Sequence, residues 1–72
     1  MVNATSTQEI FRNRLIEARE HRAITQVELA VIAGLRGSAI SNFETGMRKP
    51  SIEQLVKLAD ALGVSVDYLL GR

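Results

Sequence analysis

The feature that most constrains this chain is a short turn between two helical patterns. Apolar side chains recur at helical spacing through residues 26–33 and again through residues 37–44, with only Gly34, Leu35 and Arg36 between the two patterns. Glycine ends a helix readily because it enters the left-handed backbone region without a Cβ penalty. Two helices joined by so short a turn cannot run antiparallel, so they must cross steeply. The sequence therefore predicts a helix-turn-helix.

Three more helices are predicted around this unit, at about residues 7–22, 51–62 and 65–70. Capping boxes mark three helix starts, because Ser or Thr stands three residues before Glu or Gln. These pairs are Ser6 and Glu9, Thr25 and Glu28, and Ser51 and Gln54. The apolar residues expected to face inward are Phe11, Leu15, Ala18, Ile24, Leu29, Ala30, Ala33, Leu35, Ile40, Phe43, Ile52, Leu55, Leu58, Ala59, Leu62, Val64, Val66, Leu69 and Leu70. They predict a compact, all-α, five-helix domain over residues 7–72, preceded by a flexible N-terminal arm at 1–6.

Composition limits the chemistry that this domain can perform. The chain has 72 residues and no Cys, which excludes disulfides and Cys-based zinc sites. Its one histidine, His21, stands on a polar helix end and is expected to be solvated. We therefore expect no enzyme, no metal, no cofactor and no small-molecule ligand. The chain also lacks an apolar run long enough for a membrane span and a signal-peptide pattern, so we expect a cytoplasmic protein without a membrane partner.

The second helix of the predicted helix-turn-helix has an unusual outer face. Ile40 and Phe43 fall on one side, and the other side carries only small uncharged residues: Gly37, Ser38, Ser41, Asn42 and Thr45. Soluble helices usually place charges there. A short neutral face suits a helix that enters the major groove of DNA, where base edges are read by hydrogen bonds. Spacing alone leaves a second interpretation open, namely an ordinary exposed helix with few charges.

The distribution of charge favours the first interpretation weakly. The net charge of the chain is only +1, but residues 36–49 contain Arg36, Arg48 and Lys49 against the single acidic residue Glu44. Cations that flank a groove-binding helix can hold phosphates on either side of it.

Residues 24–70 resemble a known family. The sequence "ITQVELAVIAGLRGSAISNFETGMRKPSIEQLVKLADALGVSVDYLL" is similar to the DNA-binding domain of helix-turn-helix proteins of the Cro and phage-repressor type. The matching residues are Arg14, Arg19, Thr25, Gln26, Glu28, Leu29, Ala30, Gly34, Ile40, Ser41, Glu44, Gly46, Pro50 and the segment 58–70. The resemblance implies a lambda-repressor-like fold. It also implies a transcriptional regulator, expected to be a repressor, that binds double-stranded DNA at palindromic operators as a homodimer.

The family's functional positions carry over one by one. Contacts to base edges are implied for Ser38, Ser41 and Asn42. Arg36 stands where the family has a Ser or Thr cap near the phosphates, and we expect it to reach a guanine edge or a phosphate. A contact to a backbone phosphate is implied for Gln26, and we expect further contacts to the DNA backbone from Gly37, Thr45, Arg48 and Lys49. Arg19 and Glu44 match a structural ion pair that ties the first helix to the third. The homodimer interface is expected at Val64, Val66, Asp67 and Tyr68, although Val66 and Tyr68 could instead complete the core.

Three residues depart from the family pattern. Gly37 replaces a long polar residue. It has no side chain to reach a base edge, so it can contact DNA only through its own main chain. Arg36 has no side-chain acceptor for the first amides of the helix, which is therefore expected to begin one residue late. Ala23 stands at a helix-terminating position that favours Gly, and a left-handed backbone there would cost about 1–2 kcal/mol.

A protein-interaction module is the competing function. In that case the small neutral face would bind a helix of another protein, and the chain would be an antitoxin or an anti-regulator.

Overall fold

A computed structural model describes residues 6–72 of the chain. The predicted N-terminal arm, residues 1–6, lies outside the described residues except for Ser6. Five helices follow in order: α1 (Thr7–His21), α2 (Gln26–Ala33), α3 (Gly37–Thr45), α4 (Ile52–Leu62) and α5 (Val66–Leu69). No strand occurs within the described residues, so the predicted all-α fold class is confirmed.

The predicted helix starts are confirmed by their hydrogen bonds. Ser6, Thr25 and Ser51 each accept a bond from the backbone three residues later, and the side chains at those later positions bond back. Satisfying the first free amides of a helix in this reciprocal way fixes where it begins. Gly34, with a φ of 71°, ends α2 in the left-handed conformation, as predicted.

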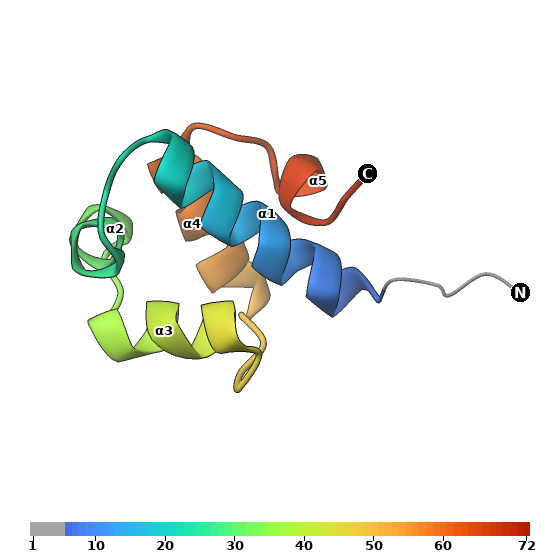
Figure 1. Ribbon diagram of the computed structural model, residues 1–72, viewed down its shortest axis with the longest axis horizontal. Coiled ribbons are helices and arrows are strands. Elements are labelled where there is room, and N and C mark those ends of the chain that lie inside the picture. Colours follow the sequence, from blue (N-terminus) through green and yellow to red (C-terminus); the bar gives the residue numbers. More distant parts are fainter. Residues whose placement is uncertain (1–5) are drawn as a thin grey trace, which may run out of the picture.

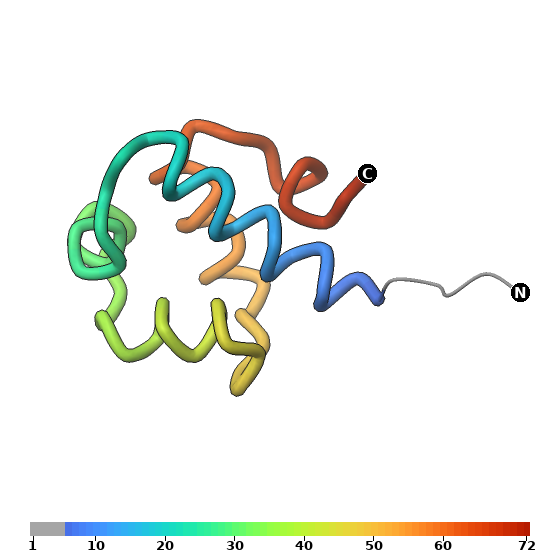
Figure 2. The backbone as a smooth tube through the Cα atoms, viewed as in Figure 1, coloured from blue at the N-terminus to red at the C-terminus, as the bar shows by residue number. Residues whose placement is uncertain are grey.

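The two halves of the helix-turn-helix cross steeply. In Figure 1, α2 is seen nearly end-on at the left of the molecule, whereas α3 lies in the plane of the picture. Figure 2 shows how short the connection between them is. Contacts between α2 and α4, and between α1 and both α3 and α5, close the domain around this pair.

The core contains buried side chains from all five helices. Phe11 of α1 and Phe43 of α3 meet edge to face, with ring centroids 6.4 Å apart. Leu15, Leu29 and Leu58 are completely buried around them. Burying aromatic and aliphatic side chains in this way is the main favourable term that holds so small a domain together.

Two details of the sequence prediction are wrong. Ile52 was expected in the core but is 83% exposed. It is the first residue of α4, and helical side chains lean towards the N-terminus, so Ile52 points beyond the end of the core. The third helix was expected to begin late, yet α3 begins at Gly37. Arg36 has the extended backbone of a cap, and its side chain makes no capping bond, as predicted.

Within residues 6–72, no helix is both long and apolar enough to cross a membrane.

Candidate nucleic-acid interface

The outer face of α3 is formed by the small polar residues that the sequence placed there. Ile40, Phe43 and Glu44 are buried, and Ser38 and Thr45 are exposed. Hydroxyl groups both donate and accept hydrogen bonds. A face of this kind can approach another surface closely and still form directional bonds.

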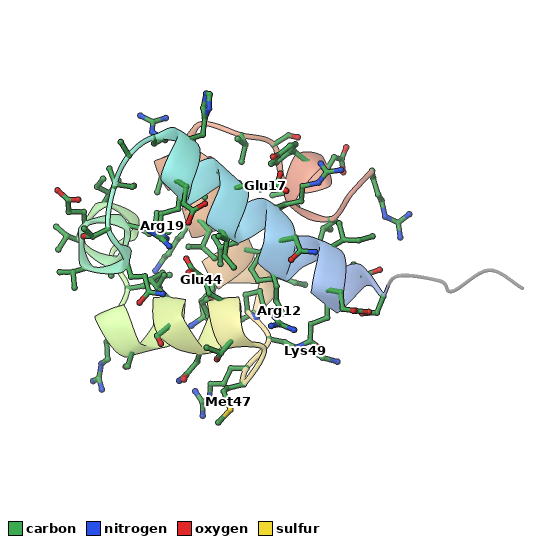
Figure 3. The ribbon with its side chains drawn as sticks, viewed as in Figure 1. Arg12, Glu17, Arg19, Glu44, Met47 and Lys49 are labelled. Carbon is green, nitrogen blue, oxygen red and sulfur yellow. The ribbon has the colours of Figure 1, made fainter. Side chains whose placement is uncertain are left out.

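Glu44 fixes the orientation of α3 although it carries a charge in the interior. Its carboxylate accepts two hydrogen bonds from Arg19 of α1, from Nε at 2.7 Å and from Nη2 at 3.2 Å. Arg19 also donates from Nη1 to the carbonyl oxygen of Ile24, at 2.9 Å. The hydrogen bond to Glu44 raises the pKa of Arg19 above its ordinary value, against the effect of burial. Figure 3 shows the two side chains pointing towards each other between α1 and α3.

Gln26, the first residue of α2, joins the same cluster. Its Nε2 donates to Oε1 of Glu44 at 2.9 Å, so part of its amide is used inside the protein. The amide nitrogen carries a second hydrogen. A contact from Gln26 to a phosphate, which the family resemblance implies, is therefore compatible with this position.

The C-terminal end of α3 is held by two residues that the sequence analysis missed. Arg12 Nε donates to the carbonyl oxygen of Glu44 at 3.2 Å, and Gln8 Nε2 donates to that of Gly46 at 3.3 Å. A cation near the last carbonyls of a helix is favourable because the helix dipole is negative there. Gln8, Arg12 and Arg19 are spaced along one face of α1, and this spacing was the signal that could have revealed them.

A polar hollow runs beside α3. It is lined by Gly34, Leu35, Arg36, Ser38, Ala39, Asn42, Arg48 and Gln54. Three of the predicted base-contacting residues thus lie in one hollow with the predicted phosphate-contacting Arg48. The backbone carbonyl oxygen of Asn42 accepts hydrogen bonds from Arg48 N, at 3.2 Å, and from Thr45 Oγ1, at 3.3 Å. Gln54 was not predicted.

Other predicted residues lie around this face. Ser41 is half-buried on α3 beside Gly37 and Glu44. Lys49 lines a separate, mainly apolar hollow with Thr7, Gln8, Phe11, Pro50, Leu55 and Leu70. Its labelled side chain and that of Met47 extend from the loop that follows α3 (Figure 3).

The surface around α3 is more positive than the sequence count indicated. Arg36, Arg48 and Lys49 are all exposed, whereas Glu44 is only 7% exposed and is paired with Arg19. Between residues 36 and 49 the chain has no other acidic residue. Within residues 36–49 the exposed charged side chains are therefore all cations, and cations can bind phosphates.

The residues proposed for the dimer interface lie on the other side of the domain. In Figure 1, α3 and α5 lie on opposite sides of α1. Val64, Val66 and Tyr68 are half-buried and pack against the core, and Asp67 is exposed. The Arg14 guanidinium lies 4.6 Å from the centre of the Tyr68 ring, where a cation–π interaction is favourable. A surface here could pair with a second subunit without covering α3.

Among residues 6–72, no group of three His, Cys, Asp or Glu side chains is placed so that it could hold a metal ion. His21 is exposed, as predicted.

Comparison with known proteins identifies the family. Residues 15–69 match the helix-turn-helix family. The chain belongs to this family, in its Cro and phage-repressor type. Over 59 residues it is 41% identical to the HTH-type transcriptional regulator ImmR of Bacillus subtilis. The aligned region covers 82% of this chain and 46% of that relative. Over 61 residues it is 38% identical to the transcriptional repressor RstR of the cryptic phage CTXphi of Vibrio cholerae, covering 85% of this chain and 54% of that relative. The chain thus spans about half the length of these relatives, which are named a transcriptional regulator and a transcriptional repressor.

Solved structures of helix-turn-helix proteins agree. The restriction-modification controller protein C.AhdI from Aeromonas hydrophila superposes with a TM-score of 0.82 at 34% identity, covering 86% of this chain and 94% of that one. The P22 c2 repressor in complex with a synthetic operator superposes with a TM-score of 0.76 at 32% identity, covering 92% and 94%. The lambda-repressor-like fold is therefore confirmed for this helix-turn-helix domain.

Proposed function

We propose that this chain binds specific double-stranded DNA sequences and represses transcription as a homodimer on palindromic operators. The observation that carries the proposal is the outer face of α3, which is small, neutral and rich in hydroxyl groups, and which is flanked by exposed cations. The P22 c2 repressor, which has this fold, was solved in complex with an operator. RstR is named a transcriptional repressor.

In this proposal α3 lies in the major groove. Asn42 has the amide that can pair with adenine through two hydrogen bonds, and Ser38 and Ser41 add single bonds. Arg36, which shares the hollow with Asn42, reaches a guanine edge or a phosphate. Gln26, Thr45, Arg48, Lys49 and the backbone of Gly37 hold the DNA backbone.

Energetics favour a dimer. A good two-bond contact to a base discriminates by about 1–3 kcal/mol, so one or two such contacts supply only a few kcal/mol. Specific sites generally need about 4–10 kcal/mol over nonspecific DNA. Two subunits that bind half-sites roughly 34 Å apart can reach this range. The proposed interface comprises Val64, Val66, Asp67 and Tyr68.

Selection from a pool of random duplexes tests DNA recognition. We expect enrichment of a palindromic sequence. Sedimentation with that duplex should give two chains per duplex, and an isolated half-site should bind more weakly. A pool that shows no enrichment would contradict the proposal.

The salt dependence of binding separates DNA recognition from the competing protein-interaction module. Phosphate contacts make affinity fall steeply with salt, because binding releases counterions. Lys49→Ala should lower the slope of log affinity against log salt by about one per subunit. Lys57→Ala removes an exposed cation from α4 and serves as the matched control, for which the slope should not change. A flat slope for the wild type, together with retained binding of a protein partner, would favour the interaction module.

A further inference from the structure

An exposed valine lies next to Gly37, the first residue of α3. Val27, the second residue of α2, is 66% exposed. Its Cγ2 atom lies 4.0 Å from the position where a Cβ atom of residue 37 would be, and no other atom outside the adjoining residues and the backbone of α3 comes that close. Gly37 therefore leaves open space at the first turn of α3, and Val27 forms one side of that space.

The chemistry of Val27 differs from that of the rest of this surface. The neighbouring groups on α3 are hydroxyls and an amide, which form hydrogen bonds with bases or with water. An isopropyl group can do neither, and it gains free energy when it is buried against another apolar group. In the major groove, the apolar group that a base edge presents is the C5 methyl of thymine.

We propose that Val27 is a specificity-determining residue that contacts the methyl group of a thymine at the base pair facing Gly37. The absence of a side chain at residue 37 gives this methyl group room to approach. The inference rests on the proposed function, since it requires α3 to lie in the major groove. It assigns to Val27, on α2, the recognition of a base pair that Gly37 cannot contact because it has no side chain.

Exposure alone does not single out Val27. Val31 lies one turn further along α2 and is 76% exposed. Ile32, which is 58% exposed, lies in a hollow with Lys57, Asp60 and Ala61 near α4. Val27 differs from both because it borders Gly37. Val31→Ala is therefore the matched control for Val27→Ala: both remove the same atoms from exposed positions of one helix.

The experiment uses the palindromic duplex that the wild-type protein selects from a random pool. Each thymine of a half-site is replaced in turn by uracil, which removes only the C5 methyl group. We expect one replacement to weaken wild-type binding by about four-fold per half-site, the change that corresponds to one buried methyl group. Val27→Ala should bind the thymine duplex more weakly by a similar factor and should not distinguish thymine from uracil at that position. Val31→Ala should behave as the wild type does.

Two results would overturn the inference while leaving the proposed function intact. One is a wild-type affinity that no uracil replacement changes. The other is a Val27→Ala protein with the same uracil sensitivity as the wild type. If the pool yields no enriched sequence at all, the proposed function fails and the inference fails with it. Thermal unfolding of both variants checks that their folds are unchanged.

Discussion

Glu44 of α3 and Arg19 of α1 form a two-bond ion pair, with oxygen–nitrogen distances of 2.7 and 3.2 Å. Glu44 is only 7% exposed, and Gln26 of α2 donates a further bond to it. The carboxylate thus joins three helices at one point. These bonds hold α3 in a fixed orientation relative to α1 and α2, with its neutral face outward.

Removing Arg19 should destabilise the fold strongly. Arg19→Met leaves a buried carboxylate without its cation, which typically costs about 3–5 kcal/mol. Urea unfolding measures the loss. Lys57→Met, at an exposed cation of α4, is the control and should change stability by less than about 0.5 kcal/mol. Equal stability of the two variants would mean that the ion pair does not hold α3.

The same pair should be insensitive to pH near neutrality. The hydrogen bond to Glu44 raises the pKa of Arg19 in the folded state. A base with a raised pKa stabilises the fold fully below its unfolded pKa, and this contribution is lost only as the pH rises through the folded value. For an arginine that window is strongly alkaline. The difference in unfolding free energy between the wild type and Arg19→Met should therefore stay constant from about pH 6 to 9. A difference that declined within this range would contradict the assignment.

The loop between α1 and α2 contains a strained residue. Ala23 has a φ of 57°, in the left-handed region, so the cost expected from the sequence is present. Ala23→Gly should raise stability by about 0.5–1 kcal/mol, because relief of the Cβ clash exceeds the added freedom of the unfolded chain.

At Gly34 the opposite change, from glycine to alanine, tests the same effect. Its φ is 71°, and a Cβ atom added there would meet nothing within 4 Å. Gly34→Ala should therefore lower stability by about 1 kcal/mol through backbone strain alone. Thermal unfolding of the two variants gives both values. Shifts of the same sign would show that backbone strain does not govern these turns.

Most of the fold could be predicted because local signals and the apolar pattern agreed. Capping boxes at Ser6, Thr25 and Ser51 fixed three helix starts, and the period of the apolar residues identified the core. The prediction failed at Ile52, where periodicity continued beyond the end of the core. Local pattern does not reveal where the neighbouring helices stop.

The candidate site was less predictable. The small face of α3 could be predicted, because exposure on one helix follows from spacing. The bonds from Gln8 and Arg12 to the end of α3 join residues more than 30 positions apart, and they depend on how α1 crosses α3. The closeness of Val27 to Gly37 likewise depends on the crossing of α2 and α3.

Arg36 is expected to strengthen operator binding while it lowers the stability of the domain. It occupies the N-cap of α3 without a capping bond. Arg36→Ser supplies an acceptor and should stabilise the domain by about 1 kcal/mol. The same change should weaken operator binding about ten-fold or more, because a charged contact is lost. Arg36→Ala should weaken binding similarly without the gain in stability. If Arg36→Ser left affinity unchanged, Arg36 would not contact DNA.

The central claim is that α3 reads base edges, and Asn42 tests it most directly. Duplexes selected by Asn42→Ala should lose the preference at one base pair of each half-site, by about 1–3 kcal/mol, and keep it elsewhere. Asn13→Ala, at an exposed asparagine of α1, is the control and should select the wild-type sequence. If Asn42→Ala selects the wild-type sequence with undiminished preference at every position, α3 does not read DNA through Asn42.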